Sequence, residues 1–281
     1  MTAADTLEFG RFGSFGRGVT PEQAKDIEAL GYGAVWVGGS PPAELAWVEP
    51  IFEKTSTLKL ATGIVNIWTA EAGPVAESFH RIDNAYPARF LLGIGVGHPE
   101  AHTQYRKPID ALNDYLDKLD RYGVPKNRRV VAALGPKVLK LSAERSAGAH
   151  PYLTTPEHTR AARDIIGPSA FLAPEHKVVL TTDAEKARAI GRKALDIYLN
   201  LTNYVSNWKR LGFTDDDVRR PGSDKLVDAF VAYGTASDIA TRLTEHIDAG
   251  ADHVPVQVLG NQDRLIPTLA ELAGPLGLTS T

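Results

Sequence analysis

The sequence contains no cysteine among its 281 residues and only one methionine. The absence of cysteine excludes disulfide bonds, thiolate metal sites and a cysteine nucleophile. Long apolar runs are also missing, since no stretch approaches the roughly 20 residues that a membrane-spanning helix needs. The segment 1–18 lacks the apolar centre of a secretory signal. The expected location is therefore the cytoplasm.

Neither sign of charge dominates the chain. Lys and Arg number 31 and Asp and Glu number 34, which gives a formal net charge of −3. This balance offers no electrostatic attraction to nucleic acid or to an anionic membrane. The composition, 43% hydrophobic and 23% charged, is typical of a globular protein with a sizeable core. We therefore expect neither nucleic acid nor a membrane as a partner.

The most informative stretch runs from Arg89 to Glu100. It begins as an apolar run of strand length and then has glycine at every second position, Gly93, Gly95 and Gly97. Alternate residues of a strand point to the same face, so a flat ligand or another backbone can approach closely there. His98 is the first titratable side chain after the glycines, and the pattern predicts a buried strand that opens onto a site. The alternative is tight packing followed by a turn. A dinucleotide fingerprint does not fit, because G-x-G-x-x-G would need glycine at position 98.

Strand and helix signals alternate along the chain. Residues Thr20-Pro21-Glu22-Gln23 have the N-cap, the first-turn proline and the capping-box glutamine of a helix start. A junction of helix end, glycine and strand recurs at residues 29–35, 146–153 and 248–259. The first strand is predicted at residues 7–12. The predicted strands lie near residues 8, 35, 61, 92, 131, 151, 178 and 256.

Eight strands that alternate with helices favour a (β/α)8 TIM barrel in the α/β class, formed by residues 1–281 as a single domain. A doubly wound open sheet is the alternative. Residues 203–228 are polar and aromatic and break the alternation. We expect them to form an insertion before the last helix–strand pair.

The C-terminal ends of barrel strands are where active sites lie. Gly63, inside the third predicted strand, indicates a bulge. Asn66 follows it and could hydrogen-bond a planar heterocycle, although a single Asn is also a common turn former. Residues Leu134-Gly135-Pro136-Lys137 lead from a strand into a helix, whose first amides favour an anion, and Lys137 adds positive charge. An ordinary connection with a solvated lysine is the alternative.

Two further side chains are candidates for chemistry. His98 is the candidate acid or base, because an unperturbed imidazole titrates near neutral pH. Ser40, after the second strand, could orient the substrate. His98 and His102 are one helical turn apart, but no carboxylate or third histidine follows in a metal-site pattern. We therefore expect no metal.

Four stretches resemble the luciferase-like monooxygenase superfamily, and most of all its branch of oxidoreductases that use the deazaflavin coenzyme F420. They are Leu30 to Val37, Leu60 to Trp68, Arg89 to Gly97 and Ala132 to Leu153. The resemblance implies a (β/α)8 barrel, usually a homodimer, with the cofactor ring across the C-terminal mouth. It places the ring against a strand-three bulge, here Gly63-Ile64-Val65, that often holds a non-proline cis peptide. The phosphate tail would lie on the backbone of Leu134-Gly135-Pro136.

The implied function is an F420-dependent oxidoreductase that transfers a hydride to or from a small organic substrate. One alternative is an FMN-dependent monooxygenase of the same superfamily, and another is a barrel that binds F420 without catalysis. The last is allowed by departures from the family pattern. Gly39 and Ser40 stand where several members carry an acidic residue and a histidine, and His98 stands where some carry a glutamate. Thr69-Ala70-Glu71-Ala72 replaces a stretch with an arginine.

One predicted helix is a candidate for the contact between the two subunits of the expected homodimer. The helix predicted at 74–85 carries Val75, Phe79 and Ile82 at helical spacing. These side chains could face either the barrel or a partner.

Overall fold

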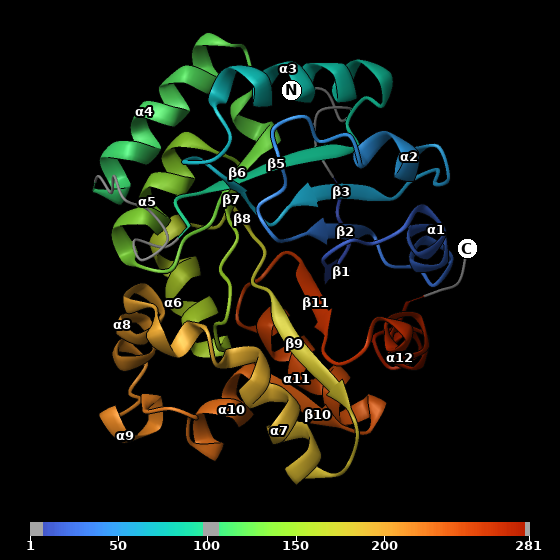
Figure 1. Cartoon of the computed structure of the whole chain (residues 1–281), viewed down its shortest axis with the longest axis vertical. Coiled ribbons are helices and arrows are strands. Elements are labelled where there is room, and N and C mark those ends of the chain that lie inside the picture. Colours follow the sequence, from blue (N-terminus) through green and yellow to red (C-terminus); the bar gives the residue numbers. More distant parts are fainter. Residues whose placement is uncertain (1–7, 98–106, 279–281) are drawn as a thin grey trace.

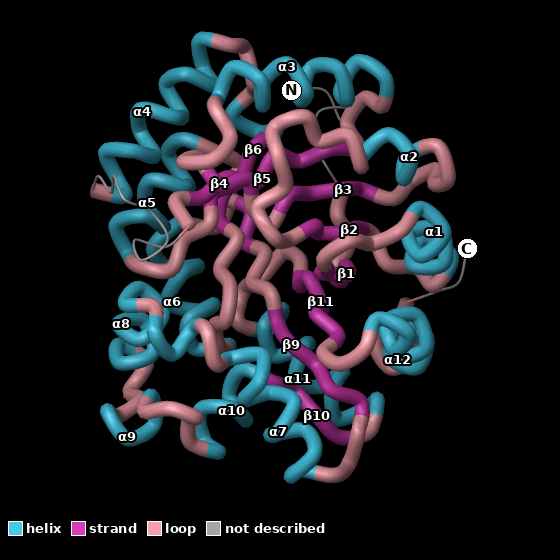
Figure 2. The backbone as a smooth tube through the Cα atoms, viewed as in Figure 1, coloured by secondary structure: helices cyan, strands magenta, loops and turns pink. Residues whose placement is uncertain are grey.

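The computed structural model describes residues 8–97 and 107–278 (Figure 1). Its strands are β1 (Phe12–Gly16), β2 (Ala34–Val37), β3 (Lys59–Thr62), β4 (Val65–Asn66), β5 (Phe90–Gly95), β6 (Arg129–Val131), β7 (Gly148–Ala149), β8 (Phe171–Leu172), β9 (His176–Leu180), β10 (Val231–Gly234) and β11 (Val254–Val258). Its α-helices are α1 (Pro21–Ala29), α2 (Val48–Phe52), α3 (Ala72–Ala85), α4 (Pro108–Arg121), α5 (Pro136–Arg145), α6 (Pro156–Ile166), α7 (Ala184–Leu195), α8 (Thr202–Arg210), α9 (Asp215–Val218), α10 (Asp224–Phe230), α11 (Ala236–Asp248) and α12 (Leu265–Ala273). Figure 2 shows the strands at the centre and the helices around them.

The strands form a parallel ring. From β1 the pairing runs through β2, β3, β5, β6 and β7 to β8 in one direction, and through β11 to β9 and β10 in the other. β8 and β9 belong to one segment, 171–180, whose first part pairs with β7 and whose second part pairs with β11. The chain itself therefore completes the ring. This arrangement confirms the predicted (β/α)8 barrel, with β10 as an additional strand beside β9.

The first strand lies later than predicted. It spans Phe12–Gly16 instead of 7–12, although Gly13 and Gly16 are poor strand formers. Pairing with β2 and β11 overrides this local preference. A Cβ atom at Gly13 would lie 2.6 Å from Nε2 of His253 and 2.7 Å from the carbonyl oxygen of Ala34, so glycine is required there. The helix start at Thr20 is confirmed, because Thr20 and Gln23 form the reciprocal capping box.

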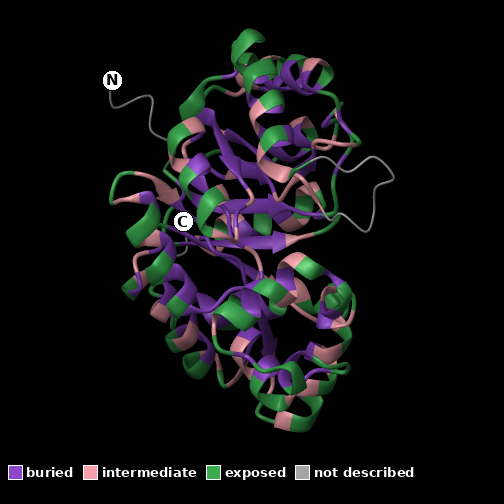
Figure 3. Cartoon of the chain, turned by 90° about the vertical axis from the view of Figure 1, so that its left-hand side faces the viewer, coloured by how far each residue is buried: buried purple, intermediate pink, exposed green. Residues whose placement is uncertain are grey.

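Two apolar layers stabilise the barrel. The outer layer lies between the strands and the helices and includes Val75, Phe79 and Ile82, each at most 1% exposed. These side chains of α3 therefore face the barrel and not a partner. The inner layer fills the barrel around Trp36 and Leu91. Figure 3 shows the buried residues on the strands and on the inner sides of the helices.

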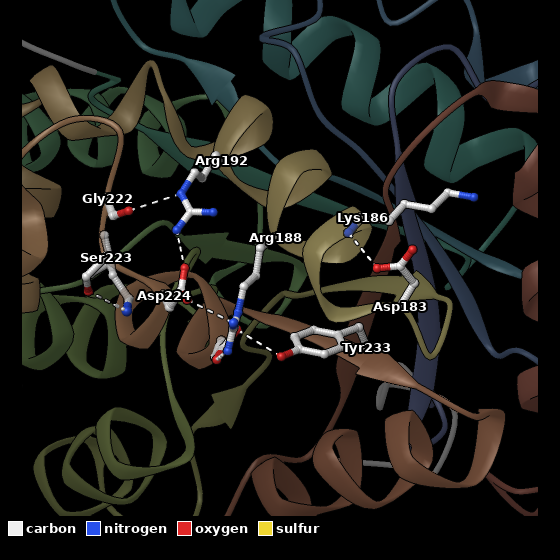
Figure 4. Close-up of polar contacts among 10 residues, drawn as sticks. Asp183, Lys186, Arg188, Arg192, Gly222, Ser223, Asp224 and Tyr233 are labelled. Carbon is white, nitrogen blue, oxygen red and sulfur yellow. Dashed lines mark hydrogen bonds and ion pairs between the residues drawn. The ribbon is translucent and has the colours of Figure 1, made fainter.

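Residues 203–228 form most of α8, all of α9 and the beginning of α10. They contribute to an apolar cluster that they share with α7, β9 and β10, in which Trp208 is fully buried. Arg188 of α7 joins this segment to the barrel, with ion pairs of 2.8 Å to Asp224 and 2.5 Å to Asp228 (Figure 4). Arg192 also pairs with Asp224. Among the helices that the structure describes, none combines the length and apolar character that crossing a membrane requires.

Candidate functional site

A cavity of about 510 Å³ opens at the C-terminal ends of the strands. The ends of β1, β2, β3, β5, β6 and β7 form its walls, and α8 contributes from the segment 203–228. This is the face of the barrel at which the sequence predicts the site. The predicted residues that line it are Ser40, Gly63, Ile64, Asn66, Gly97, Leu134 and Gly135.

Four other predicted residues lie beside the cavity and do not line it. Val65 is fully buried in the outer apolar layer, and Gly95 is buried within β5. Pro136 and Lys137 form the exposed first turn of α5. His98 lies outside the described residues, directly after Gly97, so its role stays a prediction.

The third strand is interrupted at the cavity wall. β3 ends at Thr62 and β4 begins at Val65, and the peptide bond between Gly63 and Ile64 is cis. This confirms the cis peptide that the family resemblance implies. A Cβ atom at Gly63 would lie 2.6 Å from the ring of Phe15, so glycine is needed for this aromatic side chain to pack against the break.

The alternating glycines in and directly after β5 serve two different purposes. A Cβ atom at Gly93 would lie 1.9 Å from the carbonyl oxygen of Thr62, so this glycine permits close approach of another backbone. Gly97 has φ of 58° and lines the cavity. The sequence left open whether this stretch provides tight packing or space for a ligand. Gly93 provides the first and Gly97 lies where the second is possible.

The end of the cavity at β6 is positively charged. Gly135 caps α5 without a side-chain hydrogen bond, so the partial positive charge of the helix N-terminus faces this end. A terminal nitrogen of Arg210, from α8, lies 3.7 Å from the position of a Cβ atom at Gly135. Together they form a site for an anion. Sequence reasoning missed Arg210, because nothing near it in the chain indicates that its side chain reaches the N-terminus of α5.

An aromatic wall lies on another side of the cavity. The hydroxyl group of Tyr198 donates to that of Tyr152 at 3.3 Å, and Tyr152 donates to the side-chain oxygen of Gln257 at 2.9 Å. Below them Lys177 and Glu175 form an ion pair of 2.9 Å with at most 1% exposure. Burial raises the pKa of Tyr152 far above its usual value, so its hydroxyl keeps its proton at neutral pH.

The same buried network holds the ion pair in place. Burial lowers the pKa of Lys177 and raises that of Glu175, and their mutual attraction opposes both shifts. The ammonium group of Lys177 lies 3.8 Å from the centre of the Tyr152 ring and also donates to Gln257 at 3.1 Å. The pair therefore fixes the orientation of the aromatic wall.

His150 lies at the floor of the cavity. Its ring stacks on Trp36 at 4.3 Å, and its Nδ1 atom lies 2.7 Å from the carbonyl oxygen of Ala173. The Nε2 atom is buried without a hydrogen-bond partner. Burial lowers the pKa of His150 to about 4, so the ring is neutral at pH 7. The sequence placed His150 at a strand start and gave no sign of this position.

Metal ligands do not gather anywhere in residues 8–97 and 107–278. Within these ranges no group of three or more His, Asp or Glu side chains could hold an ion. Among the described residues, the lining of the cavity includes backbone, aromatic side chains and the arginines Arg17 and Arg210.

Comparison with known proteins supports the resemblance seen in the sequence. The family model described as luciferase-like monooxygenase matches residues 18–122. An F420-dependent glucose-6-phosphate dehydrogenase of Rhodococcus jostii is 36% identical over 61 residues, which are 21% of this chain and 18% of that protein. The chain thus matches under a fifth of the length of this curated relative.

Two solved structures share the fold over nearly the whole chain. An F420-dependent secondary alcohol dehydrogenase, in complex with an F420–acetone adduct, has a TM-score of 0.73 at 13% identity, with 95% of this chain and 99% of that chain covered. The oxygenating component of a 3,6-diketocamphane monooxygenase of Pseudomonas putida, in complex with FMN, has a TM-score of 0.69 at 13% identity, with 96% and 98% covered. At this identity the likeness concerns the fold, and with the family model it confirms the resemblance to the luciferase-like proteins.

Proposed function

We propose that this chain, a luciferase-like protein by its family match and its barrel fold, is an oxidoreductase that binds coenzyme F420 in the cavity at the barrel mouth. The observation that carries the proposal is the combination of two features in one cavity. The break at Gly63 and Ile64 provides a wall for a flat ring, and Gly135 with Arg210 provides a site for an anionic tail. The similarity to the F420-dependent glucose-6-phosphate dehydrogenase and to the F420-dependent secondary alcohol dehydrogenase also supports the proposal.

The residues present fit such a cofactor. When bound, the deazaflavin would supply the hydride chemistry. Ile64, Asn66 and Gly97 would hold the ring, and the amides at Gly135 and the guanidinium group of Arg210 would hold the phosphate tail. The walls of Phe15 and Tyr152 would exclude water from the ring.

The protein must also manage a proton and orient the substrate. His98 remains the proposed acid or base, because it follows Gly97 and Gly97 lines the cavity. Ser40 lines the same cavity from the end of β2 and is proposed to orient the substrate. The substrate is a small organic molecule that accepts or donates a hydride.

Two alternatives remain separate hypotheses. FMN in place of F420 is favoured by the fold shared with the FMN-containing monooxygenase component. A barrel that binds F420 without catalysis is favoured by Gly39 and Ser40, which lack the acidic residue and histidine of several family members. A homodimer is also proposed, although α3 offers no exposed apolar contact for it.

Titration of the purified protein with F420 and, separately, with FMN tests the proposal. Fluorescence quenching should give an affinity for F420 at least tenfold higher than for FMN. A higher affinity for FMN would contradict the F420 assignment. Tight F420 binding without hydride transfer to any member of a panel of alcohols, aldehydes and conjugated acids would instead support the non-catalytic alternative.

A further inference from the structure

We propose that the end of the cavity at Arg17 binds an anionic group of the substrate, so that the substrate is a small carboxylate with a flat, apolar part. This inference rests on the proposed function, since it assigns the space that F420 would leave. Four observations support it: the position of Arg17 in the ring, the charge of the cavity walls, the residues beside Arg17 and the aromatic wall.

Arg17 and Arg210 lie at opposite sides of the barrel mouth. Arg17 directly follows β1, and Arg210 lies over Gly135 after β6. The ring has eight positions, and β6 lies four positions from β1 in either direction. In order they are β1, β2, β3, β5, β6, β7, the segment 171–180 and β11. Both arginines line the same cavity. One ligand spanning it, or two ligands side by side, would therefore meet a cation at each end.

The cavity does not neutralise these cations. Among the described lining residues there is no Asp or Glu, and neither Arg17 nor Arg210 forms an ion pair with a carboxylate of the described ranges. Burial lowers the pKa of Lys177, and the charge of Arg17 lowers it further, so the positive field of Arg17 extends below the cavity floor. A positive cavity without its own counter-charge favours an anionic ligand.

The two ends differ in what surrounds each cation. The Arg210 end includes the N-terminus of α5, which suits the phosphate tail of the cofactor. At the other end the Arg17 side chain runs along the end of β2, with its Cδ atom 3.5 Å from the position of a Cβ atom at Gly39. Ser40, next to Gly39, adds a hydroxyl group to the same wall. A guanidinium group and a hydroxyl group together suit a carboxylate, which a guanidinium binds through two parallel hydrogen bonds.

Aromatic side chains cover the space between the Arg17 end and the proposed ring wall. Phe15, the residue two before Arg17, packs against Tyr152 with tilted rings whose centres are 5.5 Å apart, and the ring centre of Tyr198 lies 5.6 Å from that of Tyr152. All three line the cavity. Such a wall favours a flat, apolar body for the molecule whose carboxylate meets Arg17.

The test uses benzoate as the probe and benzamide as its neutral analogue of the same shape. Calorimetric titration of the full-length protein, loaded with F420, should give benzoate an affinity at least tenfold higher than benzamide. Arg17→Ala should reduce benzoate binding to the level of benzamide and change F420 affinity less than twofold. Arg17→Lys should keep part of the preference. The matched control is Arg11→Ala, which removes an exposed arginine at the other end of β1 and should change nothing.

Three outcomes would overturn the inference. Equal affinity for benzoate and benzamide in the parent protein would show that the cavity does not select an anion. Unchanged benzoate binding in Arg17→Ala would place the anion elsewhere. Loss of F420 binding in Arg17→Ala would make Arg17 a cofactor residue. A parent protein that binds benzoate through Arg17 but does not bind F420 would support the anion site and refute the proposed function alone.

Discussion

Acidification from pH 7 to pH 5 should destabilise this protein strongly, because it buries several neutral histidines. Burial lowers the pKa of His150 to about 4, of His246 to about 3 and of His253 to about 4. Each ring accepts or donates hydrogen bonds as the neutral form. His246, for example, lies 2.8 Å from the hydroxyl group of Thr159 and 3.0 Å from Nδ1 of His176.

Proton binding by the folded and the unfolded chain determines whether the free energy of unfolding rises or falls with pH. An unfolded chain has histidines with a pKa of about 6.5, so between pH 6.5 and pH 4 it binds protons that the folded chain does not. The free energy of unfolding therefore falls as the pH falls through this window. Each of the three histidines contributes a loss of about 2 kcal/mol between pH 7 and pH 5, or about 6 kcal/mol in total. Burial also lowers the pKa values of His158 and His176, which act in the same direction.

A loss of this size is comparable with the whole stability of a typical domain, about 5–15 kcal/mol. Urea titrations followed by circular dichroism at pH 7, 6, 5.5 and 5 would measure it. His246→Gln should lower the stability at pH 7 and reduce the dependence of stability on pH by about one fifth, because it removes one of five buried histidines. A free energy of unfolding that changes by less than about 1 kcal/mol from pH 7 to pH 5 would refute the reasoning.

Three further predictions concern the site. Gly63→Ala should weaken F420 binding at least tenfold and lower the melting temperature, because the added methyl group would contact the Phe15 ring; unchanged affinity by fluorescence titration would remove Gly63 from the ring wall. Arg210→Ala should weaken F420 binding at least tenfold in the same titration. Arg219 is an exposed arginine outside the cavity, so Arg219→Ala should leave F420 binding unchanged. Equal effects of the two substitutions would indicate a general effect of charge. His98→Gln should reduce turnover at least tenfold at nearly constant F420 affinity, and an unchanged rate would show that the proton comes from elsewhere.

Some features of the site were predictable because they are properties of the backbone. The glycines at 63, 93 and 97 each mark a place where a side chain would collide or where the backbone adopts a special conformation. Such constraints act over a few residues, so they remain visible in the local sequence. The capping box at Thr20 and the strand–helix junction at Gly135 are local in the same way.

Other features depend on which distant segments meet, and the sequence did not indicate them. The strand β1 lies at 12–16 because β2 and β11 pair with it there. In the sequence His150 reads as an ordinary polar residue at the start of a predicted strand, yet stacking on Trp36 and the hydrogen bond to the carbonyl oxygen of Ala173 fix it beneath the cavity. Arg210 belongs to a polar helix, and only the tertiary structure shows that its side chain reaches Gly135 at the N-terminus of α5.

The difference between backbone features and side-chain features is relevant to which ligands the cavity would bind. The ring wall and the helix N-terminus consist mainly of backbone, which barrels with different side chains can share, so they indicate a class of cofactor. The cations and aromatic rings around them come from β1, from the segments that follow β1 and β7, from the helical turn at 198–200 and from α8. Arg17 and Arg210 reach the cavity from opposite sides of the ring. If the proposed function holds, the substrate is selected by residues that only the tertiary structure brings together, and no local sequence pattern indicates them. Substitutions at Arg17, Tyr152 and Tyr198 should accordingly change which substrate is accepted, and substitutions at Gly63 and Gly135 should change whether a cofactor binds at all.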